Sequence, residues 1–469
     1  MLSESVVLEQ MKHIIEPKSI AIVGASDQIY KVGGTITRNL ITSEYRGKVY
    51  LVNPKKETIY GRRVYRSLLD IEGEVELVEI VVPAPQVPSV LEEAGRKGVK
   101  GAVIISSGFS EVGNLELQEQ VYNIGRKYGM RLIGPNCFGI VNTTIGLDLT
   151  FTFTHASKGD ISFISQSGAM CCGALDWAAL NEVGFAKFIN LGNKVDVDEA
   201  DVLIYLKSDE QTKVIAMYIE GFKNGRRFYE VAREVCKIKP VIALKAGFSE
   251  AGSRASRSHT GSLSGSDQVI TAAFKQAGII RVYDIEALLD SAVAFSEQPL
   301  PAGCNVAIVS NAGGLGVMTA DWFSSLGFNV PVLSSEVQSK IKSSVLDIGS
   351  VVNPIDMTGA ADYNSYYNVI KTLMEDPNIN VIVPIYVSQG LVTSDIPAKA
   401  VVDVLKEYRK TTLTFWVGGA SITDGRMILR RNRVPCFSSA ERLAKVAKAM
   451  YDYNVFRRRY GQVREIEDR

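Results

Sequence analysis

The stretch from Ser253 to Asp267, SRASRSHTGSLSGSD, combines small polar residues with two arginines and one of the three histidines of the chain. Hydroxyl groups, unhindered backbone N–H groups and guanidinium charge together suit a large anion such as a phosphate. His259 lies in its middle, and a neutral imidazole is nucleophilic near neutral pH because its ordinary pKa is about 6.5. The pattern therefore predicts that His259 carries a phosphoryl group. The expected donors around it are Arg254, Ser256, Arg257, Ser258, Thr260, Gly261 and Ser262.

Glu220 is the acid expected to act with His259. It follows the strand-like run KVIAMYIEG, and the histidine loop follows a second run, KPVIALKAG. Because ligands bind at the carboxyl ends of parallel strands, Glu220 and His259 are expected to meet in one crevice. A carboxylate on one ring nitrogen fixes the tautomer and stabilises the cation that forms afterwards. The plainer alternative is a histidine that only makes a hydrogen bond.

The segment FISQSGAM is expected to start a helix at the end of another strand. A helix N-terminus attracts negative charge, so this one is expected to face a phosphate carried on His259. Four residues form it: Ser165, Gln166, Ser167 and Gly168. Further along, NLGNKVDVDEADVLIYL offers Asn193, Asp196 and Asp201, which either line the same cleft or cap the helix that follows.

A second anion site is expected near the N-terminus, where VGASDQIYKVGG follows an apolar run and precedes a helical segment. Its glycines at 24, 33 and 34 do not form GxGxxG. The next strand ends in YLVNPKK, where an NAD-binding unit would carry Asp or Glu. Lys55 and Lys56 instead suit a phosphorylated ribose or a second phosphate, and both NADP and coenzyme A meet this requirement. The residues leave these two ligands open.

The elements that must position these residues start in the same way three times. SIAIVGAS, GDISFISQSGA and CNVAIVSNAGGLG each run from β-branched apolar residues into a small-residue turn and then a helical segment, at intervals of roughly 140 residues. Further Val- and Ile-rich runs suit strands buried on both faces of a parallel sheet. The pattern predicts an α/β chain of about three doubly wound, parallel-sheet domains.

Composition narrows the class of protein. The formal net charge is +1 and no run is long and apolar enough to cross a membrane, so neither a nucleic-acid partner nor a membrane is expected. The six cysteines lack CxxC pairs, and no metal-ligand spacing occurs, which predicts a cytoplasmic protein without a metal of its own. The stretches 141–160 and 296–305 interrupt the alternation of strand-like and helical segments. They divide the chain into expected domains 1–145, 146–298 and 299–455 and a tail 456–469.

The ordered set of motifs resembles a known family. GASDQIYKVGG, VNPKKETIYG, VVPAPQVP, GPNCFGIVN, SQSGA, NLGNKVDVDEAD, YIEG and SHTGSLSGSD occur in this order and span essentially the whole chain. Together they are similar to the α subunit of ADP-forming acetyl-CoA synthetase (acetate:CoA ligase), within the superfamily of succinyl-CoA synthetase. The resemblance implies a Rossmann-like CoA-binding domain, a flavodoxin-like domain with the phosphohistidine loop and a third, flavodoxin-like ligase domain.

The resemblance also implies roles for individual residues. His259 would be the phosphohistidine, Glu220 its orienting acid and Asn136 of GPNC a border of the acyl site, with the helix N-terminus at 165–168 receiving phosphate. The residues that would approach coenzyme A are Gly24, Ala25, Ser26, Lys31, Val32, Gly33, Asn53, Lys55, Val82, Pro83 and Ala84.

The reaction implied is acyl-CoA + ADP + phosphate ⇌ carboxylate + CoA + ATP, through an acyl phosphate and then a phosphohistidine. No P-loop occurs and no ATP-grasp module follows the third unit, so ATP or ADP with Mg²⁺ is expected on a separate β subunit, in an α2β2 assembly. The alternatives are a non-catalytic CoA-binding or CoA-sensing protein and an NADP-linked dehydrogenase. The third glycine loop, SNAGGLG, either contacts the partner or only turns tightly.

Overall fold

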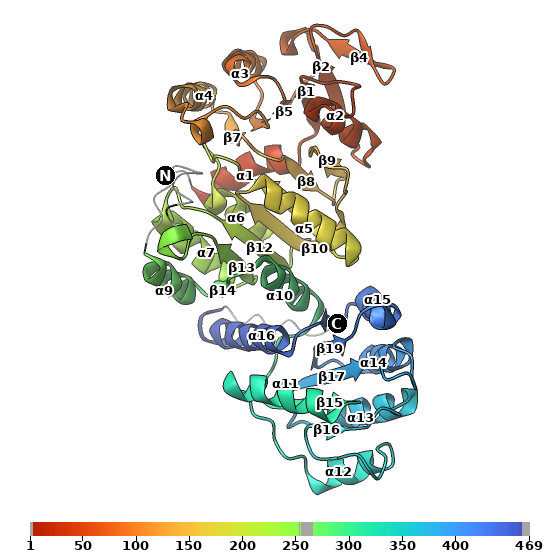
Figure 1. Cartoon of the computed structure of the whole chain (residues 1–469). Helices are drawn as coiled ribbons and strands as arrows, with labels where there is room; N and C mark the ends of the chain where they lie inside the picture. The colour runs from red at the N-terminus through yellow and green to blue at the C-terminus, as the bar shows by residue number, and fades with distance from the viewer. Residues whose placement is uncertain (1–2, 253, 255–265, 462–469) are drawn as a thin grey trace. The chain divides into compact units, whose positions relative to one another are not determined.

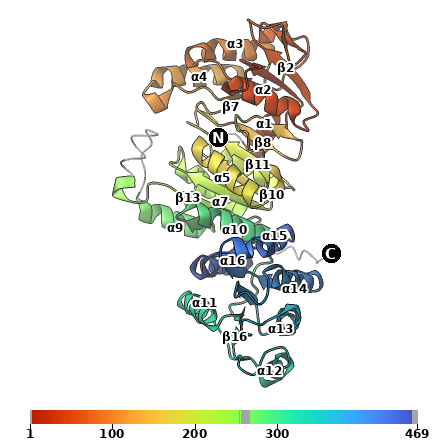
Figure 2. The same cartoon turned by 45° about the vertical axis from the view of Figure 1, so that its right-hand side comes forward.

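The computed structural model describes residues 3–252, 254 and 266–461. The chain forms two compact units, Met1–Leu288 and Leu289–Arg469, which Figures 1 and 2 show in two views. Two sheets belong to the first unit and one sheet to the second. Each sheet carries helices between its strands, so the α/β fold class predicted from the alternating pattern is confirmed.

The first sheet has seven strands in the order β3-β4-β2-β1-β5-β6-β7. Its central strands pair in parallel and are almost wholly buried, as their Val- and Ile-rich sequences require. The strands are β1 (Ser19–Val23), β2 (Lys48–Val52), β3 (Thr58–Ile59), β4 (Arg62–Tyr65), β5 (Leu77–Ile80), β6 (Gly101–Ile104) and β7 (Arg131–Ile133). The helices are α1 (Glu4–Ile15), α2 (Val32–Thr42), α3 (Val87–Lys97) and α4 (Leu115–Tyr128).

The second sheet has the order β14-β13-β12-β10-β11-β8-β9, in which β8 (Ile140–Asn142) and β9 (Leu147–Asp148) form an antiparallel edge. The parallel strands are β10 (Ser157–Ser165), β11 (Gly184–Asn190), β12 (Val214–Ile219), β13 (Val241–Lys245) and β14 (Ile280–Val282). The helices are α5 (Gly168–Leu180), α6 (Glu199–Ser208), α7 (Gly225–Cys236) and α9 (Asp267–Ala277). Helix α10 (Ile285–Glu297) continues from the first unit into the second.

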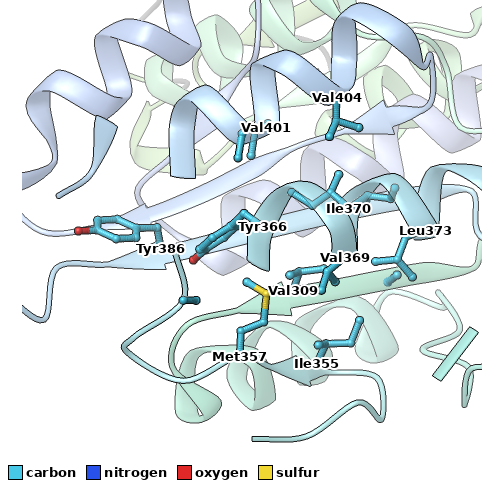
Figure 3. Packing of buried hydrophobic residues seen from close by; sticks show 14 of the residues in the cluster. Val309, Ile355, Met357, Tyr366, Val369, Ile370, Leu373, Tyr386, Val401 and Val404 are labelled. Carbon is cyan, nitrogen blue, oxygen red and sulfur yellow. The ribbon is translucent and has the colours of Figure 1, made fainter. Parts of the chain in front are cut away.

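The second unit is built on a parallel sheet of β16 (Ile355–Asp356), β15 (Val306–Ser310), β17 (Val381–Val387), β19 (Thr414–Val417) and β20 (Cys436–Phe437), with β18 (Thr411–Thr412) beside β17. Figure 3 shows part of its core, where Tyr366 and Ile370 of α13 (Tyr363–Glu375) pack with Val309 and Val401. The other helices are α11 (Gly313–Ser325), α12 (Ser335–Lys342), α14 (Asp395–Glu407), α15 (Thr423–Arg431) and α16 (Ala440–Tyr460).

The three expected strand-to-helix starts are present. Strand β1 leads into α2, β10 into α5 and β15 into α11, each through the small-residue turn seen in the sequence. The second and third turns share one local geometry. Ser165 Oγ donates to the Ser167 carbonyl at 2.9 Å, and Ser310 Oγ donates to the Ala312 carbonyl at 2.8 Å. A serine at a strand end thus braces the first turn of the helix in both units.

Candidate functional site

A cavity of about 630 Å³ lies in the first unit, where loops of both its sheets meet. It combines apolar side chains with amide, carboxylate and ammonium groups, which is the composition expected of a small-molecule site. Six of the residues predicted to be functional line it: Val32, Asn136, Gln166, Ser167, Gly168 and Glu220. The fold therefore brings together, in one cavity, predicted residues that come from distant motifs of the sequence.

Glu220 directly follows β12, and only 7% of its surface is exposed. Its backbone N–H and that of Gly221 both donate to Gln166 Oε1, at 2.5 and 2.9 Å. The N–H of Gln166 in turn donates to the Tyr218 carbonyl at 3.1 Å. These bonds hold the end of β12 against the start of α5, so Glu220 and the helix N-terminus share one rigid corner of the cavity.

His259 and its neighbours in 255–265 lie outside the described residues. The strands that flank this loop are described, however, and Ile219 of β12 pairs with Lys245 of β13. The chain therefore leaves β13 beside the strand end that carries Glu220. This is the adjacency of carboxyl ends expected from the two apolar runs.

The N-terminus of α5 is built by the four residues that the sequence indicated. Ser167 is the N-cap, and its side chain accepts the Met170 N–H at 3.3 Å. Ser165 is buried and does not line the cavity, because its hydroxyl is used to brace the Ser167 carbonyl. Gly168 is the first helical residue and faces the cavity. A phosphate at this point would meet the N–H groups and the positive end of the helix dipole.

Of the two alternatives left open by the sequence, Asn193 follows the first and Asp201 the second, whereas Asp196 follows neither. Asn193 lines the cavity. Asp196 and Asp201 instead form ion pairs with Arg131, at 2.8 and 2.9 Å, and Asp201 also completes the capping box of α6 with Asp198. These carboxylates therefore join β7 of the first sheet to α6 of the second.

The glycine loop after β1 is tightly packed. Gly24 has a φ of +97°, and a Cβ on it would lie 2.4 Å from the Val81 carbonyl oxygen. A Cβ on Gly33 would lie 2.3 Å from the Gly24 carbonyl oxygen. Helix α2 then begins at Val32, and its N-cap Lys31 makes no side-chain capping bond. The Gly34 N–H donates to the Lys31 carbonyl at 2.8 Å, which leaves the N–H groups of Val32 and Gly33 to meet an anionic ligand.

The other residues expected near coenzyme A surround this loop. Asn53 Nδ2 donates to the Ala25 carbonyl at 2.8 Å, and Asn53 Oδ1 accepts the Lys55 N–H at 2.9 Å. Lys56 is paired with Asp27 at 3.2 Å, and this hydrogen bond lowers the pKa of Asp27. Lys55 has an exposed side chain. Val82 lies next to Gly24, just after the end of β5, and Pro83 and Ala84 follow it in the chain, whereas Ser26 belongs to the glycine loop itself.

A histidine and a cysteine of the first unit also have partners of their own. His155 Nδ1 lies 2.8 Å from Asp148 Oδ2, and this hydrogen bond raises the pKa of His155. Burial raises the pKa of Cys137, whose Sγ donates to the Ile104 carbonyl, as expected of a packed cysteine and not of a nucleophile. In the described part of the chain, no three His, Cys, Asp or Glu side chains are grouped to hold a metal ion. None of the described helices is long and apolar enough to cross a membrane.

Models of three protein domains match the chain. Residues 18–143 match a CoA binding domain, residues 158–295 a succinyl-CoA ligase like flavodoxin domain and residues 306–448 a ligase-CoA domain. The alpha subunit of acetate–CoA ligase [ADP-forming] II of Pyrococcus furiosus is 43% identical over 94% of this chain and 97% of that subunit. The chain belongs to the family of ADP-forming acetate–CoA ligases.

Other members of this ligase family are also similar to the chain over most of its length. The acetate–CoA ligase [ADP-forming] of Methanocaldococcus jannaschii is 43% identical over 96% of this chain, which spans 64% of that protein's length. Acetyl-coenzyme A synthetase 1 of Ca. Korarchaeum cryptofilum, solved with phosphate and ADP, is 34% identical and superimposes with a TM-score of 0.92 over 98% of this chain and 99% of that one. The family and ligase class predicted from the ordered motifs are confirmed.

Sequence reasoning missed several side chains that build this ligase cavity. Lys194 has a buried side chain and a φ of +55°, and its Nζ lies 2.6 Å from both Glu199 Oε1 and the Gly221 carbonyl oxygen. It therefore holds the Glu220 loop at the Gly221 carbonyl, whereas Gln166 accepts from the N–H groups of Glu220 and Gly221. Glu111 and Gln118 also line the cavity. A lysine next to a glycine turn and an acidic run was the available signal for Lys194.

Proposed function

We propose that this chain is the α subunit of an ADP-forming acyl-CoA synthetase that acts on acetyl-CoA. It would convert acyl-CoA, ADP and phosphate to a carboxylate, CoA and ATP. The observation that carries the proposal is the corner formed by Glu220 and the α5 N-terminus, held together by Gln166 beside the strand that precedes the His259 loop.

The chemistry proceeds in three transfers. A phosphate oxygen attacks the thioester carbonyl carbon, the carbon–sulfur bond breaks and CoA leaves as its thiol. A ring nitrogen of His259 then attacks the phosphorus of the acyl phosphate, and the carboxylate leaves. Finally a terminal oxygen of ADP attacks the phosphohistidine to give ATP and free imidazole. The first step moves the acyl group to phosphate, and the other two move the phosphoryl group between acceptors, so holding the phosphate in line and neutralising its charge is the main task of the protein.

Each described element has a part in this task. The α5 N-terminus, from Gln166 to Gly168, stabilises the negative phosphoryl group through its N–H groups and dipole. Glu220 orients the imidazole of His259 and stabilises its cationic form. Asn136 borders the acyl group. Positioning comes from the part-buried bonds of Gln166 and the buried bond of Lys194, which leave the Glu220 loop little freedom to move.

The glycine loop of the first sheet fits coenzyme A. The close backbone approach at Gly24 and Gly33 leaves no room for side chains, and the N-terminus of α2 offers N–H groups to a pyrophosphate. Lys55 supplies a cation near the phosphates. Because this loop and the cavity share Val32, a thioester could reach from one to the other.

The nucleotide and its Mg²⁺ belong, in this proposal, to a β subunit with an ATP-grasp fold, in a cytoplasmic α2β2 complex. The naming of the Pyrococcus relatives as alpha subunits supports a separate partner. The division of the chain into domains 1–145, 146–298 and 299–455 with a tail from 456 is part of the same proposal.

The test is transfer of label from [³²P]phosphate to the chain in the presence of acetyl-CoA. Wild type should gain an acid-labile label that is absent from His259→Asn, and Glu220→Gln should be labelled at least about tenfold more slowly. Glu230→Gln, at an exposed position of α7, is the charge-matched control and should label normally. Equal labelling of wild type and His259→Asn would refute the phosphohistidine. A chain that binds coenzyme A but never takes up label would favour the non-catalytic alternative.

A further inference from the structure

A chain of hydrogen bonds crosses the cavity wall from the first sheet to the second. Asn193 Nδ2 donates to Glu111 Oε2 at 2.6 Å and to Gln118 Oε1 at 3.0 Å. Asn193 Oδ1 accepts from Asn136 Nδ2 at 3.3 Å. Glu111 belongs to the short helix η3 (Ser110–Val112) and Gln118 to α4, whereas Asn193 lies in the loop after β11. All four side chains line the cavity.

The direction of this chain of bonds is set by the backbone. The N–H groups of Gly108 and Phe109 donate to Glu111 Oε1 at 2.5 and 3.2 Å, and the N–H of Ser110 donates to Gln118 Oε1. Burial alone would raise the pKa of Glu111, but these bonds and the one from Asn193 lower it, so the side chain is an ionised acceptor at neutral pH. Both groups that face Asn193 are therefore acceptors.

Two acceptors leave the Asn193 amide a single orientation. Its NH₂ group must face Glu111 and Gln118, so its carbonyl oxygen must face Asn136. Asn136 must then turn its own NH₂ group toward Asn193. Its backbone is already fixed by the turn after Pro135, whose carbonyl accepts the Asn193 N–H at 2.9 Å. The rest of the Asn136 amide is presented at the cavity wall with a defined polarity.

We propose that Glu111 and Asn193 are positioning residues that orient the Asn136 amide toward the acyl carbonyl. The inference rests on the proposed function, because it assigns the acyl group to the side of the cavity that Asn136 borders. Glu111 and Asn193 touch no reacting atom. They act by preventing rotation of the Asn136 amide, which would otherwise present a donor and an acceptor to the substrate interchangeably.

Glu111→Gln tests this polarity with little change in shape. The backbone N–H groups hold the oxygen of Gln, so its NH₂ group meets the NH₂ group of Asn193. Only Gln118 then holds the Asn193 amide, whose orientation is no longer fixed. We expect the rate of acetyl phosphate formation from acetyl-CoA and phosphate to fall about 10- to 100-fold, in kcat, because a reacting group is misplaced. The KM for acetyl-CoA should stay within about twofold, since the glycine loop that approaches coenzyme A is unchanged.

Two comparisons separate positioning from folding. Glu119→Gln, exposed on α4, makes the same charge change and should retain the wild-type rate. The double variant Glu111→Gln with Asn193→Asp exchanges donor and acceptor, because an aspartate at 193 can accept from both Gln at 111 and Asn136. The Gln118 amide must then turn its NH₂ group toward the aspartate, which costs only its long bond of 3.4 Å from the Ser110 N–H. It should recover at least half of the loss, measured as the logarithm of kcat. A double variant no faster than Glu111→Gln would overturn the proposal, as would wild-type activity of Glu111→Gln.

The ATP-driven direction distinguishes this inference from the proposed function. With an ATP-grasp β subunit and [γ-³²P]ATP, Glu111→Gln should be labelled on His259 like wild type, because this transfer does not involve the acyl group. Equal losses in both directions would show a merely structural role and overturn the inference. Full labelling of His259→Asn would instead refute the phosphohistidine, while the acetyl phosphate assay would still decide the role of Glu111.

Discussion

Glu79 is a carboxylate in the middle of the first sheet. It lies on β5 between Ile22 of β1 and Val103 of β6, and none of its surface is exposed. Among the described residues, neither of its carboxylate oxygens has a hydrogen-bond partner. Burial raises the pKa of Glu79 well above the ordinary value of 4.5, and the charge of Asp148 raises it further. We therefore predict that Glu79→Gln stabilises the first unit at neutral pH.

The sign and size follow from proton linkage. Because the pKa of Glu79 is higher in the folded chain than in the unfolded chain, the folded state holds a proton that the unfolded state loses above pH 4.5. The free energy of unfolding then falls by about 1.36 kcal/mol per pH unit until the pH reaches the folded-state pKa. Between pH 4.5 and 7 the loss reaches at most about 3.4 kcal/mol, which is a large part of the usual 5 to 15 kcal/mol. Gln has nearly the same shape but no proton to lose.

Hydrogen exchange measured by mass spectrometry is the suitable assay, because peptides from β1 and β6 report on the stability of the first unit alone, which contains Glu79. Protection, corrected for intrinsic exchange, should be nearly equal in wild type and Glu79→Gln at pH 4.5. From there to pH 7 the protection of Glu79→Gln should exceed that of wild type by a growing amount, up to about 3 kcal/mol when expressed as a free energy. Glu74→Gln, exposed in the preceding loop, should show no such trend. A pH-independent difference between wild type and Glu79→Gln would refute the reasoning.

Two further substitutions test how the site is built. Gly33→Ala forces a Cβ against the Gly24 carbonyl. It should therefore weaken coenzyme A binding at least tenfold in calorimetry and destabilise the first unit by about 1 to 3 kcal/mol. Gly173→Ala, in open space on α5, should have neither effect. Lys194→Met leaves Glu199 buried without its cation and should lower the free energy of unfolding by about 3 to 5 kcal/mol in urea denaturation. The double variant Lys194→Met with Glu199→Gln should recover much of this loss of stability. If the losses of the two single variants simply added in the double variant, a buried ion pair would be contradicted.

The features predictable from the sequence are those that depend on neighbouring residues. The runs around Ile22, Phe163 and Ile308 are apolar and β-branched because both faces of a parallel strand are buried, and each becomes a strand. The helix start at Ser167 depends on residues within three positions. Asp196 and Asp201 were ambiguous because their partner, Arg131, belongs to the other sheet and has many possible acidic neighbours in the sequence.

The polarity of the cavity wall could not be predicted for the same physical reason. Asn193 contacts Asn136 and Glu111 across 57 and 82 positions of the sequence, and each of these hydrogen bonds forms only when the loops of the two sheets are brought together. Nothing in the type or spacing of three such residues indicates that backbone N–H groups fix Glu111 as an acceptor. The motifs therefore identify which residues meet, whereas the direction of their hydrogen bonds, on which the proposed role of the Asn136 amide depends, is a property of the assembled backbone.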